Sequence, residues 1–159
     1  MRMKRREFIR LLAGATIAGP GAAIAQAAPK AFRLGTLTPG PPIDEKNPLG
    51  AILLKALEQH GYVLGKNLSL EARGAGGEVG KLGELVRGLK ANQVNVIVAA
   101  GFPVVLACKI ANVPTVVAFG GGDPVATRLI DGLARPGGSI TGISDNATTL
   151  STKRLALVK

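Results

Sequence analysis

The sequence predicts an α/β fold, a doubly wound parallel sheet with helices on both faces. The first observation behind this prediction is the order of the patterns. Short apolar, β-branched stretches alternate with amphipathic helical patterns, as in a parallel sheet wound by helices. The second is that two apolar stretches are almost continuously hydrophobic, as strands covered on both faces are. Right-handed crossovers would then place helices on both faces.

The amino-terminal part of this pattern consists of a strand, a loop and a helix. Residues 32–37 are apolar-rich and end at the proline-rich stretch 39–42, as a strand followed by a loop would. Asn47 is a favourable N-cap and Pro48 suits the first helical position. Apolar residues then recur at helical spacing until Gly61, which is suited to end the helix.

Two further units of strand and helix follow. Residues 68–72 alternate in hydropathy as a strand near a sheet edge does, and residues 79–89 form a second amphipathic helix. The stretch 94–100 (VNVIVAA) predicts a central parallel strand. Residues 103–111 predict a short helix, and 114–119 predict another buried strand.

The last part of the chain predicts one more strand between two helices. Asp123 and Pro124 are suited to cap and start a helix over 125–133. Residues 138–144 predict a strand, and a helix begins near Thr148. This last pattern continues to the final residue without a stop signal. We interpret the chain as one lobe of a longer protein or as a truncated reading frame.

The first 27 residues have the layout of an export signal. A cationic start precedes an uncharged run rich in Leu, Ile, Ala and Gly, and small residues suit cleavage near Ala25 or Ala27. Arg5, Arg6 and Phe8 resemble the consensus of a twin-arginine signal. An uncleaved membrane anchor is the alternative, but the run barely reaches the ~20 residues of a bilayer span and contains a proline. The expected location is therefore the periplasm.

Charge and composition argue against nucleic-acid binding. The chain carries a formal net charge of +10, and residues 1–25 hold five Lys or Arg and one Glu, so about +6 is spread over the rest. With four Phe, one Tyr and no Trp, the sequence offers neither the basic stripe nor the aromatic platforms that nucleic-acid binding uses. We expect no nucleic-acid partner.

Residues with enzymatic or metal chemistry are sparse. Cys108 is the one cysteine and sits in an apolar helical stretch, so we interpret it as a small buried residue. His60 is the one histidine and falls at a predicted helix end, where it caps carbonyls or meets solvent. No ligand spacing predicts a metal site, and no hydrolase signature is present. We therefore expect no enzyme activity, catalytic residue, metal or cofactor.

A glycine-rich stretch leaves a second function open. Gly74–Gly80 follows a strand and opens a helix, as the loop of a dinucleotide-binding fold does. That fold also needs a charged residue about 20 residues further on, where the sequence offers Ala99, Ala100 and Gly101. A flexible loop is the preferred interpretation, and a nucleotide-dependent Rossmann-like enzyme is the alternative.

The candidate ligand-binding residues follow the ends of three predicted strands, because open parallel sheets place their crevice at the carboxyl ends of the strands. Glycines there allow close approach of the backbone, helix starts supply N–H groups, and an aspartate supplies a carboxylate. Such a rim suits a small zwitterion. Each residue is equally compatible with an ordinary tight turn, with the aspartate as a helix cap. The candidates are Thr36, Leu37, Thr38, Gly101, Phe102, Gly120, Gly121 and Asp123.

Several segments resemble the periplasmic solute-binding proteins of ABC importers, specifically their type I group. The resemblance covers nearly all of the chain, and Gly120–Ser144 is its most specific part. The segments are RREF (5–8), GYVLGKNLSLEAR (61–73), LVRGLKANQVNVIVAAG (85–101), FGGGDPV (119–125) and LARPGGSITGIS (133–144).

The resemblance implies a two-lobed clamp that closes about a hinge on a solute and presents it to a membrane permease. In these terms residues 1–27 are the signal, 28–147 are the amino-terminal solute-binding lobe, and 148–159 start the crossover helix towards a second lobe. The implied partners are a small solute, for which an amino acid is one candidate, and an ABC permease in the inner membrane. A non-functional truncated fragment remains a further alternative.

Overall fold

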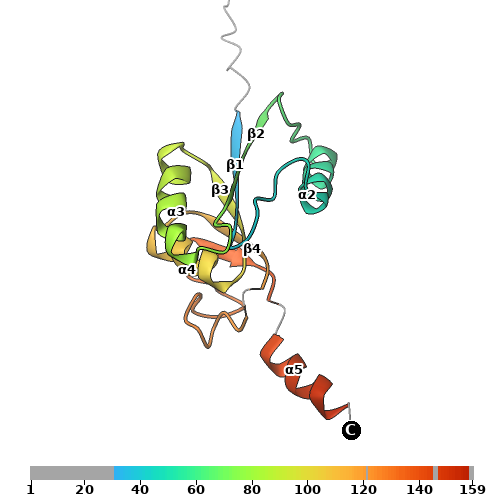
Figure 1. Ribbon diagram of the computed structural model, residues 1–159, viewed down its shortest axis with the longest axis vertical. Helices are drawn as coiled ribbons and strands as arrows, with labels where there is room; N and C mark the ends of the chain where they lie inside the picture. The colour runs from blue at the N-terminus through green and yellow to red at the C-terminus, as the bar shows by residue number, and fades with distance from the viewer. Residues whose placement is uncertain (1–30, 121, 145–146, 158–159) are drawn as a thin grey trace, which may run out of the picture. The chain divides into compact units, whose positions relative to one another are not determined.

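A five-stranded, all-parallel sheet organises the chain in the order β2-β1-β3-β4-β5 (Figure 1). The order confirms that the second strand in sequence lies at a sheet edge and that the VNVIVAA stretch contributes the central strand. The strands are β1 (Phe32–Thr38), β2 (Leu68–Gly74), β3 (Val96–Ala100), β4 (Thr115–Phe119) and β5 (Ile140–Gly142).

Helices lie on both faces of this sheet, which confirms the predicted doubly wound α/β class. In Figure 1, α3 (Leu82–Ala91) and α4 (Phe102–Ile110) lie together on one face and α2 (Pro48–Gln59) lies on the other. A short 3₁₀ turn, Val79–Lys81, leads into α3, and α5 (Ala147–Ala156) follows β5 in sequence. Among the described residues, no helix combines the length and the apolarity needed to cross a membrane.

The computed structural model describes residues 31–120, 122–144 and 147–157. Residues Ala31–Lys159 belong to one unit. The export-signal residues Arg5, Arg6 and Phe8 lie outside the described residues, as does Gly121.

The start of α2 follows the predicted capping chemistry. The Asn47 side-chain oxygen accepts a hydrogen bond of 3.0 Å from the backbone N–H of Leu49, and Pro48 occupies the first turn. Both features satisfy or remove amide donors that a helix start leaves without partners. At the other end His60 is the C-cap residue and is exposed.

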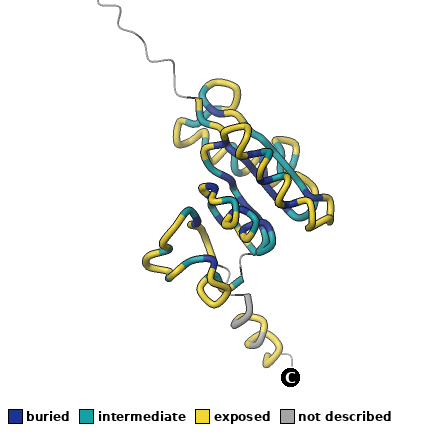
Figure 2. Tube along the Cα trace, turned by 90° about the vertical axis from the view of Figure 1, so that its left-hand side faces the viewer, coloured by how far each residue is buried: buried dark blue, intermediate teal, exposed yellow. Residues whose placement is uncertain are grey.

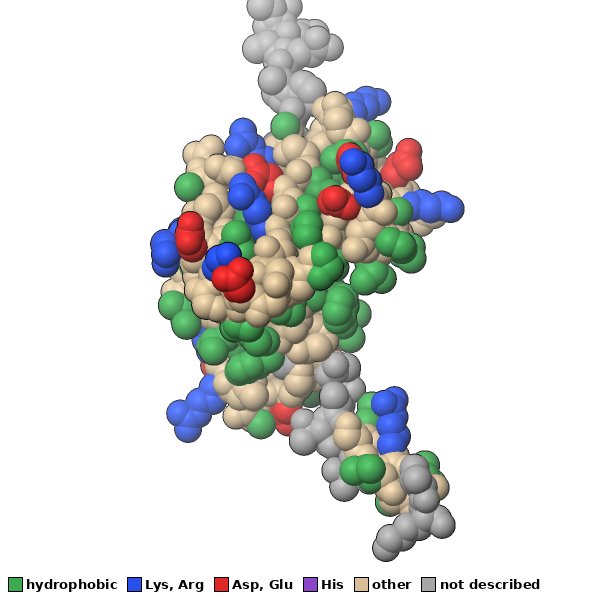
Figure 3. Space-filling model, in the orientation of Figure 1, with side chains coloured by type: hydrophobic (Ala, Val, Ile, Leu, Met, Phe, Trp, Pro, Cys, Tyr) green, Lys and Arg blue, Asp and Glu red, His purple; other side chains and the backbone are tan. Residues whose placement is uncertain are grey.

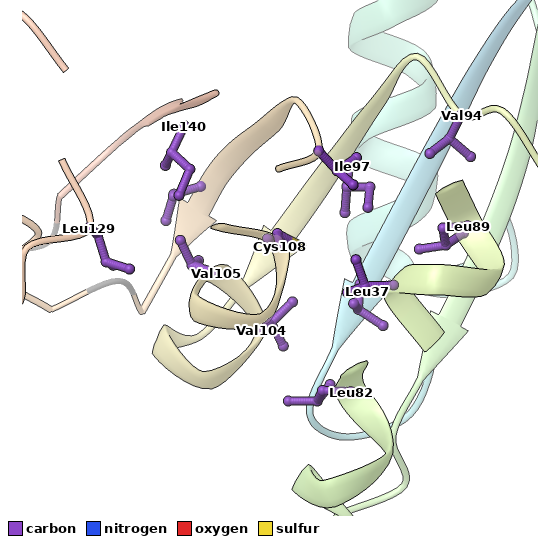
Figure 4. Close-up of a cluster of buried hydrophobic side chains, with 14 of the residues drawn as sticks. Leu37, Leu82, Leu89, Val94, Ile97, Val104, Val105, Cys108, Leu129 and Ile140 are labelled. Atoms are coloured by element: carbon purple, nitrogen blue, oxygen red, sulfur yellow. The ribbon is translucent and has the colours of Figure 1, made fainter. Parts of the chain in front are cut away.

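The hydrophobic core lies between the sheet and the pair α3 and α4 (Figures 2 and 4). Leu37 and Ile97 project from neighbouring strands and are fully buried. Each such side chain contributes about 1.5–3 kcal/mol to folding. Gly35 leaves room for the Ile97 side chain on the neighbouring strand β3, because a Cβ at residue 35 would lie 3.2 Å from Cγ1 of Ile97. The helical residues that complete the core are Leu82, Val86, Leu89, Val104, Val105 and Cys108.

The predicted helix over 125–133 is wrong, because the chain forms a series of turns there. The Asp123 cap is present, but the turn that it starts does not propagate. Arg128 adopts a φ of +57°, and the N–H groups of the next two residues both donate to the carbonyl of Pro124. Leu129 is nevertheless buried, so the apolar pattern reflects burial in an irregular segment.

Candidate ligand-binding edge of the sheet

The carboxyl ends of β1, β3 and β4 come together at one edge of the sheet. The N–H of Gly101 donates a 3.0 Å hydrogen bond to the carbonyl of Phe119. A Cβ on Gly120 would lie 3.2 Å from the Cα of Gly101, and a Cβ on Gly101 would lie 3.6 Å from Cγ of Pro39. We call the following residues the rim: Pro39, Gly101, Gly120, Gly122 and Asp123.

The rim lies where the sheet order changes direction. From β1 the chain first goes to β2 on one side and then crosses to β3 on the other. Open α/β sheets bind ligands outside the carboxyl ends of the strands at such a switch point. The topology therefore favours this edge as a ligand site.

The rim glycines adopt backbone conformations that side chains disfavour. Gly101 has a φ of 85° and a ψ of 144° as the N-cap of α4, and Gly120 and Gly122 have φ values of 70° and 65°. Glycine reaches these regions without a steric penalty. The result is bare backbone at the places where the three loops meet.

The candidates on β1 lie just below the rim and brace it. Leu37 is fully buried in the core, and Thr36 and Thr38 are also buried. The Thr36 hydroxyl donates to the carbonyl of Ile43 at 2.8 Å, and the Thr38 hydroxyl donates to that of Pro41 at 2.6 Å. These hydroxyls therefore hold the loop after β1 in place.

Phe102 and Asp123 occupy two different environments at this edge. Phe102, the first residue of α4, is half-buried and packs against the core. Asp123 is exposed, and its Oδ1 accepts hydrogen bonds from the N–H groups of Val125 at 3.0 Å and Ala126 at 2.9 Å. Its position beside Gly122 places a carboxylate at the outer part of the rim.

Sequence reasoning missed two features beside the rim. The Ser144 hydroxyl donates a 3.0 Å hydrogen bond to the carbonyl of Gly122 and so joins the end of β5 to the rim. An apolar cavity also lies next to Gly122, between β4, β5 and the turns after Pro124. Part of the cavity wall is formed by the turns that stand in place of the predicted helix, and the apolar spacing alone does not reveal them.

The Gly74–Gly80 loop differs from a phosphate-binding loop. The N–H group of Ala75 donates to the carbonyl of Thr38, at the end of β1, at 3.0 Å. The N–H groups of Gly76 and Gly77 donate to the carbonyls of Gly40 and Pro39, in the loop after β1, at 3.0 and 2.8 Å. A Cβ on Gly74 would overlap the Gly40 carbonyl. These glycines serve close packing against the segment around the end of β1, and three amides of the loop that a phosphate-binding loop would present to its ligand are bonded within the chain.

The main polar network lies away from the rim, towards the amino end of β1. The Glu71 carboxylate accepts two hydrogen bonds from Nδ2 of Asn92, at 2.9 and 3.0 Å, and one from Arg73 at 3.2 Å. The Asn92 hydrogen bonds are the main reason that the pKa of Glu71 lies below its ordinary value. On the face drawn in Figure 3, cationic and acidic side chains are intermingled. The network supports the fold and does not reach the candidate site.

The chain matches the family model described as "ABC transporter substrate binding protein" over residues 46–159. No curated protein matches it. Among solved structures, it is similar to a conserved domain protein from Vibrio cholerae, with 25% identity and a TM-score of 0.67. That likeness covers 80% of this chain and 43% of the other.

Two further solved structures share the fold at lower identity. One is an ABC domain in complex with L-Trp from Streptococcus pneumonia, at 22% identity and a TM-score of 0.60, covering 72% of this chain and 39% of that chain. The other is the ligand-free, open form of a substrate-binding protein with adhesive properties from Clostridium difficile, at 21% identity and a TM-score of 0.62. That likeness covers 77% of this chain and 43% of the other. The chain thus spans about two-fifths of the length of these structures.

Proposed function

Because this chain belongs to the ABC transporter substrate-binding protein family, we propose that it is the solute-capturing component of an ABC-type importer. It binds a small solute at the rim and delivers that solute to a permease in the inner membrane. A second lobe closes over the bound solute, in the manner of hinged clamps. The role is one of binding, without catalysis.

The observation that carries this proposal is the meeting of three strand ends at the rim. Gly101 contacts both neighbouring loops, and its own backbone starts α4. The positive end of the α4 dipole therefore lies at the rim, where it favours a negative group. Bare backbone at a switch point and a helix start together suit a small anionic or zwitterionic solute.

An amino acid fits this arrangement of charges. The N-terminus of α4 attracts a carboxylate, and Asp123 at the outer rim attracts an ammonium group. The structural neighbour solved with L-Trp supports amino acids as the first class to test. Solute capture takes place in the periplasm, after export directed by Arg5, Arg6 and Phe8 and cleavage near Ala25 or Ala27.

Calorimetric titration of the chain with a panel of small metabolites, including the standard amino acids, tests the proposal. We expect binding heat for at least one solute. Asp123→Asn removes the rim carboxylate and should weaken that binding roughly tenfold to a hundredfold, the range of a hydrogen bond to a charged group. Glu84→Gln is the matched control, since Glu84 is an exposed carboxylate on α3.

Circular dichroism of each variant separates lost binding from lost folding. Unchanged affinity in a folded Asp123→Asn variant would remove Asp123 from the site. An absence of heat for every solute in the panel would overturn the proposed function itself.

A further inference from the structure

We propose that the cavity beside the rim receives a small branched aliphatic group of the solute, such as the side chain of leucine or isoleucine. This inference rests on the proposed solute-binding function and specifies which solutes the site prefers. It is carried by the position, the lining and the size of the cavity.

The position of the cavity links it to the rim. Gly122 belongs to both, and the hydrogen bond from the Ser144 hydroxyl to the Gly122 carbonyl ties the two walls together at 3.0 Å. A solute whose charged groups lie at the rim can therefore extend an attached side chain into the cavity.

The lining selects an apolar group. The floor consists of Val117, Leu129 and Ile140, which are buried, and Leu133 and Ile143 flank the mouth. None of the described residues that line the cavity carries a charge. A charged head group would lose its hydration there without gaining a partner, so the ionic part of the solute stays at the rim.

The mouth residues are unusually exposed for their size. Leu133 is 73% exposed and Ile143 is 70% exposed. An aliphatic side chain that enters between them would cover apolar surface on both. Each methylene removed from water in this way raises affinity roughly fourfold.

The size of the cavity favours aliphatic groups over aromatic rings. Its volume is about 90 Å³. An apolar cavity that holds benzene has about 150 Å³. A branched aliphatic group therefore fits, whereas a phenyl or indole ring requires the turns after Pro124 to move.

Titration of the chain with alanine, valine, leucine, isoleucine, phenylalanine and tryptophan tests this inference. We expect affinity to rise roughly fourfold per methylene from alanine to leucine and isoleucine. Phenylalanine and tryptophan should bind at least tenfold more weakly than leucine. Equal or tighter binding of the two aromatic amino acids would overturn the inference.

A mouth variant tests the location of the aliphatic group. Ile143→Trp changes an exposed residue and should lower leucine affinity to that of alanine, with alanine binding unchanged. Ile110→Trp is the control, because Ile110 is 79% exposed on α4, outside the cavity. If both variants bind leucine as the unmodified chain does, the side chain lies elsewhere and the inference is wrong.

The two proposals fail in different ways. Binding of some other solute from the wider metabolite panel, with no response to any amino acid of the series, overturns the aliphatic inference and leaves solute capture standing. Failure of every solute overturns both.

Discussion

The backbone N–H of Gly101 donates a 3.0 Å hydrogen bond to the carbonyl of Phe119 and fixes the end of β3 against the end of β4. At the same residue the chain turns into α4, where Gly101 is the N-cap with a φ of 85°. The geometry of the candidate site thus depends on a backbone conformation that only glycine adopts at low cost.

Gly101→Ala should destabilise the protein by about 1–3 kcal/mol, the usual cost of forcing a side chain into a disfavoured backbone region. Urea unfolding followed by circular dichroism measures the change. Gly88→Ala is a control for which we expect a change in stability of the opposite sign, because Gly88 lies inside α3 with open space around a new Cβ. It should stabilise the helix by about 1 kcal/mol. Equal effects of the two substitutions would show that the Gly101 backbone is not strained by a side chain.

Burial raises the pKa of the Cys108 thiol from its ordinary value of 9.0 to about 11, with a smaller opposing effect of its hydrogen bond to Thr115. Between these two values the unfolded chain loses the thiol proton and the folded chain keeps it. Stability should therefore fall as pH rises above 9, because the unfolded state then binds fewer protons.

The difference in unfolding free energy between the unmodified chain and Cys108→Ala measures this effect, since other groups titrate equally in both. We expect the difference to fall by about 1 kcal/mol between pH 9 and pH 10. At pH 8 the folded chain should also resist a thiol reagent that labels the urea-unfolded chain at once. Rapid labelling of the folded chain would contradict the buried position.

Nucleotides should leave the melting temperature unchanged. NAD, NADP or ATP would raise it by mass action if the folded chain bound them, but the amides of Ala75, Gly76 and Gly77 are bonded to carbonyls of residues 38–40. Thermal melts with millimolar nucleotide check this expectation. A reproducible upward shift would revive the Rossmann-like alternative.

Replacing Arg5 and Arg6 together by lysine should abolish export if the first 27 residues act as a twin-arginine signal. The prediction depends on the paired guanidinium groups, which the double substitution removes while the net charge of the segment stays the same. Cell fractionation and immunoblotting in a bacterial host measure the periplasmic fraction. Arg2→Lys is the control, and continued export of the double variant would contradict the twin-arginine assignment.

Much of the fold could be predicted from the sequence because each element carries a local signal. Continuous β-branched residues identified the central strand, and Asn47 with Pro48 located the start of α2. Strand order is a long-range property, but alternation of strands and helices restricts it strongly. The parallel sheet and its central strand therefore followed from the pattern.

The predictions from sequence failed where the local sequence pattern and the tertiary packing favour different structures. Asp123 and Pro124 begin a turn that local rules extend into a helix, whereas the bonds to the Pro124 carbonyl and the conformation of Arg128 end it. Gly101 and Gly120 directly follow the ends of β3 and β4, as the strand pattern predicts, and their role in solute binding stays a prediction. The cavity and the Ser144 bond could not be inferred, because they depend on how distant segments pack.

The three hydrogen bonds from the Gly74–Gly80 loop to the end of β1 and the loop after it have a consequence for solute recognition. That part of the rim is rigid before any solute arrives, so association loses little backbone entropy there. Adaptation to different solutes must then come from the turns after Pro124. Evolution or engineering of a new preference would therefore act on that segment, while the β1 side remains a fixed reference surface.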